Sequence, residues 1–395
     1  MPETQAATLR AAHEGDPIAL CRVLVAIPSE NPSLAPGGSG ESEIAGLTAG
    51  LLEEWGLAVD VVEVAEGRPN VVAHLEGEGP TLLLNGHLDT VAAAHMRVPP
   101  FAADLRDGRI RGRGACDMKG GVASLMAAVR RLALEEGHRP SVVVALTADE
   151  EHTSLGMQAL VASGVRADLA VVCEPTSLAV MPAHKGFVWL EAIFRGKAAH
   201  GSRPDVGVDA IRHAGLYLSS LDALQKDLEA RPAHPLLGHG SWHVGTVHGG
   251  EADSVYPAAC RLTLERRTLP GEAGEDVLRE FRSVLDGVRA RHPNVEADLR
   301  ITLERAGTEV ATDDPLVRGL LAAARACGVA RGVAGMTAWV DAAWLNQAGI
   351  PAVCFGPGSI AQAHSADEWI DAREIEVCAE ILERFARDAA GPSAS

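Results

Sequence analysis

The chain has 395 residues, of which 47% are hydrophobic and 22% are charged, and this length makes two globular domains the default expectation. Its formal net charge of −18 disfavours nucleic acid and anionic membranes as partners, because both carry negative phosphate groups that would be repelled. No stretch of the sequence approaches the roughly 20 apolar residues that a membrane-spanning helix needs.

The first part of the chain alternates short apolar strands with helical patterns. We predict strands at residues 71–75, 81–85, 142–147 and 169–173, and helices at residues 41–55 and 121–136. Alternation of this kind is typical of a largely parallel sheet that is covered by helices on both faces.

A different order of elements begins near Lys185. An alternating strand at residues 187–195 is followed by a helical pattern at 208–224, and then by strand patterns at 241–247 and 260–268. A second helix at 275–289 and a strand at 295–303 complete this segment. The order strand, helix, strand, strand, helix, strand is that of a ferredoxin-like unit.

After about residue 303 the alternating pattern returns, with helices predicted at residues 315–327 and 371–388 and a buried strand at 352–355. The economical interpretation is one α/β domain, formed by residues 1–184 and 304–395. An α+β domain, residues 185–303, is inserted into it.

Cysteine usage and the first residues of the sequence both favour the cytoplasm. The seven cysteines are an odd number without CxxC pairs, so they predict neither a disulfide framework nor a thiolate zinc site. The first 20 residues mix charges with alanine and contain no apolar run, so we expect no secretory signal. We expect a cytoplasmic protein whose thiols are reduced and mostly buried.

Acidic and imidazole side chains gather at five places where apolar strands end or a helix begins. The first is GHLDT at residues 86–90, where the spacing of His87 and Asp89 suits a metal-binding imidazole held by a nearby carboxylate. The second is GACDMKGG at residues 114–121. Here Asp117 is either a metal ligand or, as this segment alone favours, the N-cap of the helix that follows.

The third place is TADEE at residues 147–151, where Glu150 and Glu151 belong to a run of three acids after an apolar strand. Such a run is unfavourable unless solvent or a cation neutralises it. Solvation is the ordinary explanation, and a metal that uses one carboxylate while its neighbour acts as a base is the alternative. The fourth and fifth places supply Glu174 in VCEPT and His364 in AHSADE.

These five motifs converge on one expected site, because ligands bind outside the carboxyl ends of the strands in an α/β sheet. Nitrogen and oxygen ligands of this kind suit Zn²⁺, Co²⁺ or Mn²⁺. From about residue 16 to residue 385, the chain resembles the M20 family of metallohydrolases, which includes acetylornithine deacetylase, succinyl-diaminopimelate desuccinylase, aminoacylase and bacterial glutamate carboxypeptidase. The resemblance is specific, because five individually weak motifs occur in the family's order together with the insertion.

The resemblance implies a zinc-exopeptidase-like fold, a homodimer formed through the inserted domain, and two divalent metal ions. Zinc is the first expectation, with cobalt or manganese as alternatives. His87, Asp117 and Glu174 would hold one metal, while Asp117, Glu151 and His364 would hold the other, so that Asp117 bridges them.

The resemblance also implies the catalytic roles. Two metals about 3.5–4 Å apart can share a hydroxide and polarise an amide carbonyl. Glu150 would act as general base toward the water and then as acid toward the leaving amine. Asp89 would orient His87, and the peptide bond between Asp117 and Met118 would be cis.

Four further residues belong to the implied substrate site. His200 would stabilise the oxyanion in the site of a neighbouring subunit. Arg267, in ERRTLPG at residues 265–271, would bind a substrate carboxylate bidentately, the alternative being a solvated arginine. Ser254 stands where the family commonly places an Asn that contacts substrate. Trp339, in the loosely matching GMTAWVDA at residues 335–342, would line the pocket or belong to the core.

The sequence therefore predicts a metal-dependent amidohydrolase that deacylates a small, carboxylate-bearing N-acyl amino acid. A dipeptidase or carboxypeptidase of the same family is the alternative. An inactive metal-binding scaffold is a further class, which Glu150 disfavours because a scaffold needs no base. The sequence leaves open the acyl group, the amino-acid side chain, the native metal, the pathway and the effect of Ser254.

Overall fold

The structure is a computed structural model that describes residues 3–135 and 139–390, and the chain divides into two compact units. Unit 1 consists of Met1–Pro182, Val310–Ala334 and Val340–Ser395. Unit 2 consists of Ala183–Glu309 and Gly335–Trp339. Unit 1 is therefore assembled from segments that lie on both sides of unit 2 in the sequence.

A nine-stranded sheet has the strand order β1-β2-β6-β3-β7-β15-β8-β13, with β14 (Val333–Met336) paired to β8. Four strands form its parallel centre: β6 (Pro140–Thr147), β3 (Glu78–His87), β7 (Leu169–Val172) and β15 (Ala352–Cys354). Antiparallel strands extend both sides: β1 (Ala58–Ala65), β2 (Arg68–Leu75), β8 (Val180–His184) and β13 (Thr308–Glu309). The predicted fold class is confirmed, and the antiparallel edge strands are an addition to it.

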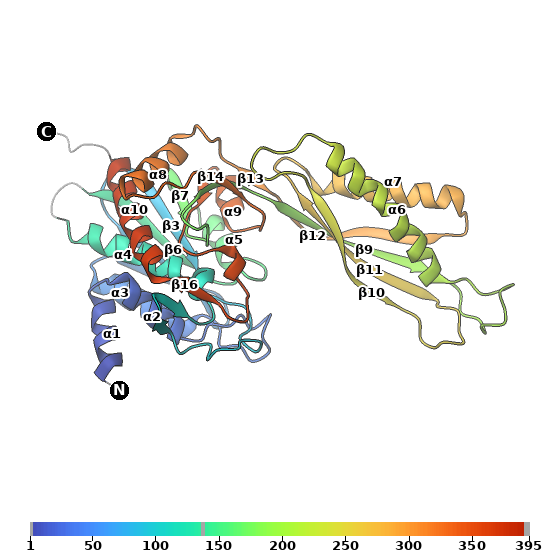
Figure 1. Cartoon of the computed structure of the whole chain (residues 1–395), viewed down its shortest axis with the longest axis horizontal. Coiled ribbons are helices and arrows are strands. Elements are labelled where there is room, and N and C mark those ends of the chain that lie inside the picture. Colours follow the sequence, from blue (N-terminus) through green and yellow to red (C-terminus); the bar gives the residue numbers. More distant parts are fainter. Residues whose placement is uncertain (1–2, 136–138, 391–395) are drawn as a thin grey trace. The chain divides into compact units, whose positions relative to one another are not determined.

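Helices cover both faces of the parallel centre (Figure 1). On one face, α4 (Gly120–Ala133) and α10 (Ala372–Ala390) contact β3 and β6, where Leu82 and Leu84 are buried in the main core. On the other, α5 (Leu155–Ala162) contacts β2 and α9 (Ala342–Gln347) contacts β7 and β15. The predicted end of the α4 helix at Glu136 lies outside the described residues.

The remaining elements of unit 1 complete its core and its loops. They are the helices α1 (Glu3–His13), α2 (Pro17–Ala26), α3 (Ser42–Glu54) and α8 (Pro315–Ala326), the short turns η1 (Ala115–Lys119) and η2 (Ile360–Gln362), and a small sheet of β4 (Asp104–Arg106), β5 (Arg109–Arg111) and β16 (Trp369–Asp371). The first turn of α4 lies against the end of β7, since a Cβ added at Gly121 would meet the Cys173 carbonyl oxygen at 2.0 Å. Only glycine permits this close approach.

Unit 2 has the predicted ferredoxin-like order of elements: β9 (Gly186–Arg195), α6 (Ala210–Ala230), β10 (Ser241–Gly249), β11 (Ala259–Thr268), α7 (Gly274–Arg291) and β12 (Glu296–Arg305). Its antiparallel sheet has the order β10-β11-β9-β12, so β10 and β12 are edge strands. Alternation along β9 buries Leu190 and Phe194 in the core of this unit, whereas Trp189 is exposed.

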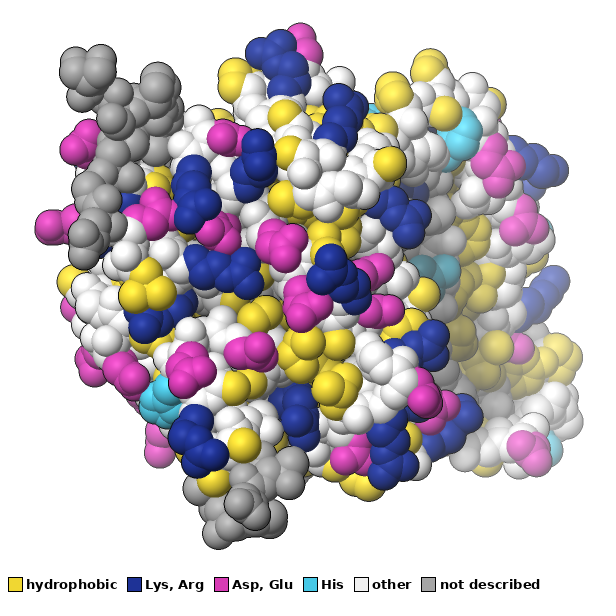
Figure 2. Space-filling view, turned by 60° about the vertical axis from the view of Figure 1, so that its left-hand side comes forward, with side chains coloured by type: hydrophobic (Ala, Val, Ile, Leu, Met, Phe, Trp, Pro, Cys, Tyr) yellow, Lys and Arg dark blue, Asp and Glu magenta, His cyan; other side chains and the backbone are white. Residues whose placement is uncertain are grey.

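All seven cysteines are free thiols, and six of them are buried. Among the described residues, no helix combines the length and the apolar character that crossing a membrane requires. On the face of the molecule seen in Figure 2, basic and acidic side chains are interspersed with hydrophobic ones.

Candidate metal centre

The predicted metal ligands and the predicted base lie at the carboxyl ends of the parallel strands or in loops beside them, all within unit 1. They are His87 at the end of β3, Asp117 in η1, Glu150 and Glu151 after β6, Glu174 after β7 and His364 after η2. Parallel strands bring their carboxyl ends to one edge of a sheet, so residues separated by up to 277 positions can meet there.

Five of these side chains form two overlapping groups of possible metal ligands, which differ from the two predicted ligand sets and do not include His364. His87, Asp117 and Glu151 make one group, and His87, Glu150 and Glu174 make the other. Within each group, one ligand atom of every residue lies within 4.8 Å of the others. Glu150, the predicted base, therefore lies beside the ligands and is itself close enough to be one.

Asp117 lies between the two histidines. Its Oδ1 is 3.2 Å from Nε2 of His87, and its Oδ2 is 3.4 Å from Nε2 of His364. His364 Nε2 is also 2.9 Å from Oε2 of Glu151. Each oxygen of the Asp117 carboxylate thus faces a different imidazole, which is the arrangement that a bridging ligand needs.

The electrostatics of the cluster favour a cation. Burial and the charge of Glu174 raise the pKa of Glu150 well above its usual value, and burial and the charge of Asp117 do the same to Glu174. Burial and Asp117 also raise the pKa of Glu151. A divalent cation among these carboxylates would oppose these shifts, because its charge stabilises the ionised carboxylates and neutralises their mutual repulsion.

The imidazoles respond to the same charges. Hydrogen bonds with Asp117 and Glu151 raise the pKa of His364 to about 10. Burial lowers the pKa of His87, but the hydrogen bond with Asp117 and the charge of Glu150 outweigh it and raise the pKa well above the usual value. A cluster of carboxylates that stabilises a protonated imidazole also attracts metal ions, and its nitrogen and oxygen donors are those that Zn²⁺, Co²⁺ or Mn²⁺ accept.

The alternative interpretation of Asp117 as a helix N-cap is wrong. Helix α4 begins at Gly120, and its N-cap position is occupied by Lys119 without a side-chain cap. The Asp117 carboxylate instead lies beside the imidazoles. The peptide bond between Asp117 and Met118 is cis, as the resemblance implied.

A buried glutamate that sequence reasoning missed holds the backbone around Asp117. Glu368 accepts hydrogen bonds from the backbone N–H groups of Gly114, Cys116 and Asp117 at 3.0, 2.9 and 3.1 Å, and from Nη1 of Arg113 at 2.6 Å. The AHSADE motif contains both Glu368 and His364, so the motif offered a signal. Its meaning depended on contacts with a segment about 250 residues earlier.

Asp89 is bonded mainly to the turn after β6 and contacts His87 chiefly through its backbone. His87 Nδ1 lies 2.9 Å from the Asp89 carbonyl oxygen, which can only accept, so Nδ1 carries the proton and Nε2 faces Asp117. The Asp89 carboxylate accepts hydrogen bonds from the backbone N–H groups of Glu150 at 3.1 Å and Glu151 at 3.3 Å. It is farther from His87, at 3.6 Å.

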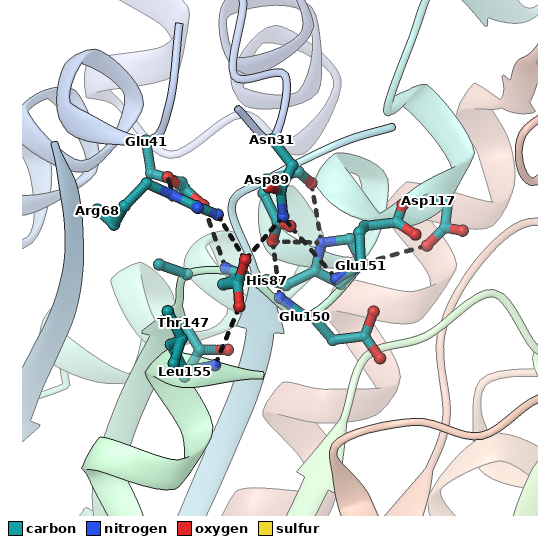
Figure 3. Close-up of polar contacts among 12 residues, drawn as sticks. Asn31, Glu41, Arg68, His87, Asp89, Asp117, Thr147, Glu150, Glu151 and Leu155 are labelled. Atoms are coloured by element: carbon teal, nitrogen blue, oxygen red, sulfur yellow. Dashed lines mark hydrogen bonds and ion pairs between the residues drawn. The ribbon is translucent and has the colours of Figure 1, made fainter. Parts of the chain in front are cut away.

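Sequence reasoning also missed three buried polar residues near Asp89, of which Asn31 donates to its carboxylate at 2.8 Å. Figure 3 shows Glu41 and Arg68, which are bonded to each other, on the side of Asp89 away from Asp117, and Asn31 next to Asp89. No local motif marks these residues, because they lie in three segments that carry ordinary polar positions.

The other predicted residues belong to unit 2, where two of them lie side by side. The backbone N–H of Gly201, next to His200, donates to the Ser254 carbonyl oxygen at 2.6 Å, and His200 forms a β-bridge with Val255. Both His200 and Ser254 are exposed, and His200 Nδ1 lies 2.8 Å from Oγ of Ser202.

Arg267 and Trp339 share an aromatic neighbour that was not predicted. The Arg267 guanidinium lies 5.4 Å from the ring centre of Phe187, and the Trp339 ring meets Phe187 edge-on at 6.2 Å. Arg267 Nε donates to Glu265 at 2.6 Å, so in this structure the guanidinium already has a carboxylate partner. Trp339 is half-buried, and its Nε1 donates to the Ala306 carbonyl oxygen.

Comparisons with known proteins give one consistent set of similarities. The family model described as peptidase family M20/M25/M40 matches residues 83–388. An acetylornithine deacetylase of Myxococcus xanthus is 34% identical over 324 residues, which cover 80% of this chain and 82% of that protein. The crystal structure of a Staphylococcus aureus tripeptidase is similar with a TM-score of 0.80 and 21% identity, covering 96% of this chain and 99% of that one. A Bacillus subtilis protein described as a dinuclear metal-binding M20 peptidase has a TM-score of 0.72 and 19% identity, covering 96% and 98%.

Proposed function

Because the chain belongs to peptidase family M20/M25/M40 and is a metal-dependent amide hydrolase, we propose that it removes the acyl group from an N-acylated amino acid. The observation that carries this proposal is the cluster of carboxylates and imidazoles at the edge of the parallel sheet, in which His87, Asp117 and Glu174 are buried and His364 is exposed. Similarity to an acetylornithine deacetylase over most of the chain favours deacylation, whereas the tripeptidase is similar in fold alone.

In this proposal the cluster holds two divalent cations, with zinc as the first expectation. His87, Asp117 and Glu174 hold one of them, and Asp117, Glu151 and His364 hold the other. Bound cations supply Lewis acidity toward the amide carbonyl and lower the pKa of water. The contacts of Asp117 with both imidazoles and the dinuclear Bacillus subtilis protein of the same fold support this assignment.

Glu150 moves the proton in this proposal. It takes a proton from the attacking water and delivers it to the nitrogen of the leaving amine. Burial and the charge of Glu174 raise its pKa, which suits a carboxyl group that must both accept and release a proton near neutral pH. Its backbone N–H is bonded to Asp89, so the turn that carries it is fixed.

The test is a panel of N-acetyl, N-succinyl and N-carbamoyl amino acids and unmodified dipeptides, assayed with added Zn²⁺, Co²⁺ or Mn²⁺. We expect the best N-acyl substrate to exceed the best dipeptide by at least about tenfold in kcat/KM, which corresponds to ~1.4 kcal/mol of transition-state stabilisation. A protein that prefers dipeptides with a free amino terminus would contradict deacylation while leaving the metal centre in place.

We also propose that the active form is a homodimer in which His200 of one subunit completes the site of the other. Two features of unit 2 support this. Its sheet has two edge strands, β10 and β12, which offer unpaired backbone groups to a second copy. His200 is exposed, and a neutral or protonated imidazole can donate a hydrogen bond to an oxyanion.

Mixed dimers test the role of His200. Removing one oxyanion donor typically lowers the rate by about 10²–10³-fold, so His200→Ala and Glu150→Gln should each be nearly inactive alone. Co-expression of the two variants with different tags should restore about a quarter of the wild-type activity, since half of the dimers are mixed and each has one intact site. The control is co-expression of two differently tagged copies of the same variant, which should remain nearly inactive. Mixed dimers that form but stay inactive would contradict a role across the interface.

A further inference from the structure

Five buried polar side chains are linked to one another next to the turn that carries Glu150 and Glu151, and Figure 3 labels Asn31, Glu41, Arg68 and Asp89 among them. At most 5% of any of these residues is exposed. They come from five separate segments of unit 1: Asn31 after α2, Glu41 before α3, Arg68 at the start of β2, Asp89 after β3 and Asp149 after β6.

Hydrogen bonds link the five side chains one after another, from Glu41 at one end to Asp89 at the other. Arg68 donates to Glu41 through Nε and through Nη2, the latter at 2.6 Å, and Nη2 also lies 3.1 Å from Oδ1 of Asp149. The Asn31 amide nitrogen then joins two carboxylates, at 3.0 Å from Oδ1 of Asp149 and 2.8 Å from Oδ2 of Asp89. At the end of this series, the Asp89 carboxylate accepts hydrogen bonds from the backbone N–H groups of Glu150 and Glu151.

Asp149 directly precedes Glu150 and fixes the start of the same turn. Its backbone has a φ of +66°, in the left-handed region that few residues other than Gly, Asn and Asp adopt. Its Oδ2 accepts from the backbone N–H of Thr153 at 3.1 Å, and its own N–H donates to Oε1 of Glu41 at 3.1 Å. Glu150 and Glu151 therefore follow a residue whose backbone and side chain are both held.

The charges explain why Asn31 and Arg68 are needed. Asp89 and Asp149 are buried carboxylates that accept from the same amide nitrogen, so they lie close enough to repel each other. The guanidinium of Arg68 supplies positive charge to Asp149, and the Asn31 amide satisfies one oxygen of each carboxylate. If Asn31 or Arg68 were removed, the two carboxylates would move apart or bind water, and the turn that carries Glu150 and Glu151 would shift.

We propose that Asn31 and Arg68 are positioning residues of this hydrolase, which act through Asp149 and Asp89 to hold the turn that aims Glu150 and Glu151. The inference rests on the proposed function, in which Glu150 transfers the proton. Misplacing the base should lower kcat and leave KM unchanged, because neither Asn31 nor Arg68 is among the residues assigned to the substrate.

The decisive variant is Asn31→Ala, and Asn346→Ala is its matched control. Asn346 bonds the Ala342 and Ala352 carbonyl oxygens at 3.1 and 2.9 Å, so its loss removes a comparable amide bridge elsewhere in unit 1. We expect Asn31→Ala to lower kcat on the order of 10–100-fold relative to that control. With saturating added metal, KM and the metal content per chain should stay within about twofold of the wild type, because Glu151 shares its assigned ion with Asp117 and His364, which the substitution leaves in place.

A second measurement reads the position of the turn without any substrate. In the protein as isolated, the backbone N–H groups of Glu150 and Glu151 should exchange with deuterium at least about tenfold faster in Asn31→Ala than in the wild type, because their acceptor Asp89 is no longer held. In Asn346→Ala these two amides should exchange at the wild-type rate. Failure of the wild type to hydrolyse any N-acyl substrate would overturn the proposed function, and the exchange rates would still test the positioning.

Arg68→Lys and Arg68→Ala provide an independent series if Asn31→Ala does not fold. Lysine keeps the charge but lacks the planar fork that reaches Glu41 and Asp149 together, so Arg68→Lys should lie between the wild type and Arg68→Ala in both kcat and amide exchange. Unchanged exchange at Glu150 and Glu151 in a folded variant would overturn the inference. Parallel losses of kcat, metal content and melting temperature would overturn it as well, because they would indicate a general structural role.

Discussion

Replacing Glu150 with Gln should lower kcat by about 10²–10⁴-fold while the protein keeps its metal, because the amide cannot accept and return a proton. The substitution preserves the size of the side chain and removes only its charge. The backbone contact of Glu150 with Asp89 does not involve the side chain and should persist. Metal content by elemental analysis, measured on the same samples as kcat, checks this expectation.

Glu151→Gln is the matched control, since it makes the same change at the neighbouring residue. Glu151 contacts His364 at 2.9 Å and is assigned as a ligand, so this variant should lose metal together with activity. The comparison is needed because Glu150 also lies within ligand distance of His87 and Glu174. If Glu150→Gln loses metal in proportion to activity and Glu151→Gln does not, the two roles are exchanged.

Removing the metal should abolish activity without unfolding the protein. The loss of several kcal/mol of transition-state stabilisation corresponds to a fall in rate of about 10³-fold or more. The ligands lie at strand ends and in loops, whereas the core of unit 1 is built from apolar side chains on the strands and helices around them. Circular dichroism of the chelated protein should therefore remain that of a folded chain, with a lower melting temperature because bound metal stabilises the folded state.

Adding back Zn²⁺, Co²⁺ or Mn²⁺ should restore activity, and saturation at two ions per chain is expected if Asp117 bridges two sites. Asp117→Ala should lose both ions, whereas Glu174→Ala should lose one. Full turnover by a preparation whose metal content is near zero would exclude the metal-dependent mechanism. Saturation at one ion would contradict the bridging role while leaving metal dependence intact.

Local patterns in the sequence were sufficient for most of the regular structure. The apolar run at residues 81–85 lies within β3, and the helical spacing at 275–289 lies within α7, because burial on one face imposes a period that neighbouring residues reveal. The ferredoxin-like order of unit 2 followed from the same periods. By contrast, β1 (Ala58–Ala65) was not predicted, since it is an edge strand with mostly exposed residues and shows no alternation of burial.

The motifs predicted that the candidate ligands meet at one edge of the sheet, and they lie at strand ends or in loops beside them, because the direction of a parallel strand fixes where its carboxyl end lies. The sequence by itself thus determined the fold class, the family and the group of His, Asp and Glu side chains that meet. It left Asp117 between two interpretations, because a carboxylate before a helix is more often a cap than a ligand.

Only the tertiary structure decided how those side chains are held. Asp117 faces the imidazoles because its backbone is bonded by Glu368, a residue 251 positions later, and Asn31 joins Asp89 to Asp149 across 58 and 118 positions. Buried polar groups need partners wherever the fold supplies them, and those partners have no fixed spacing in the sequence. A hydrophobic period is a local property that the sequence displays, whereas a buried hydrogen-bond network exists only once distant segments have packed together.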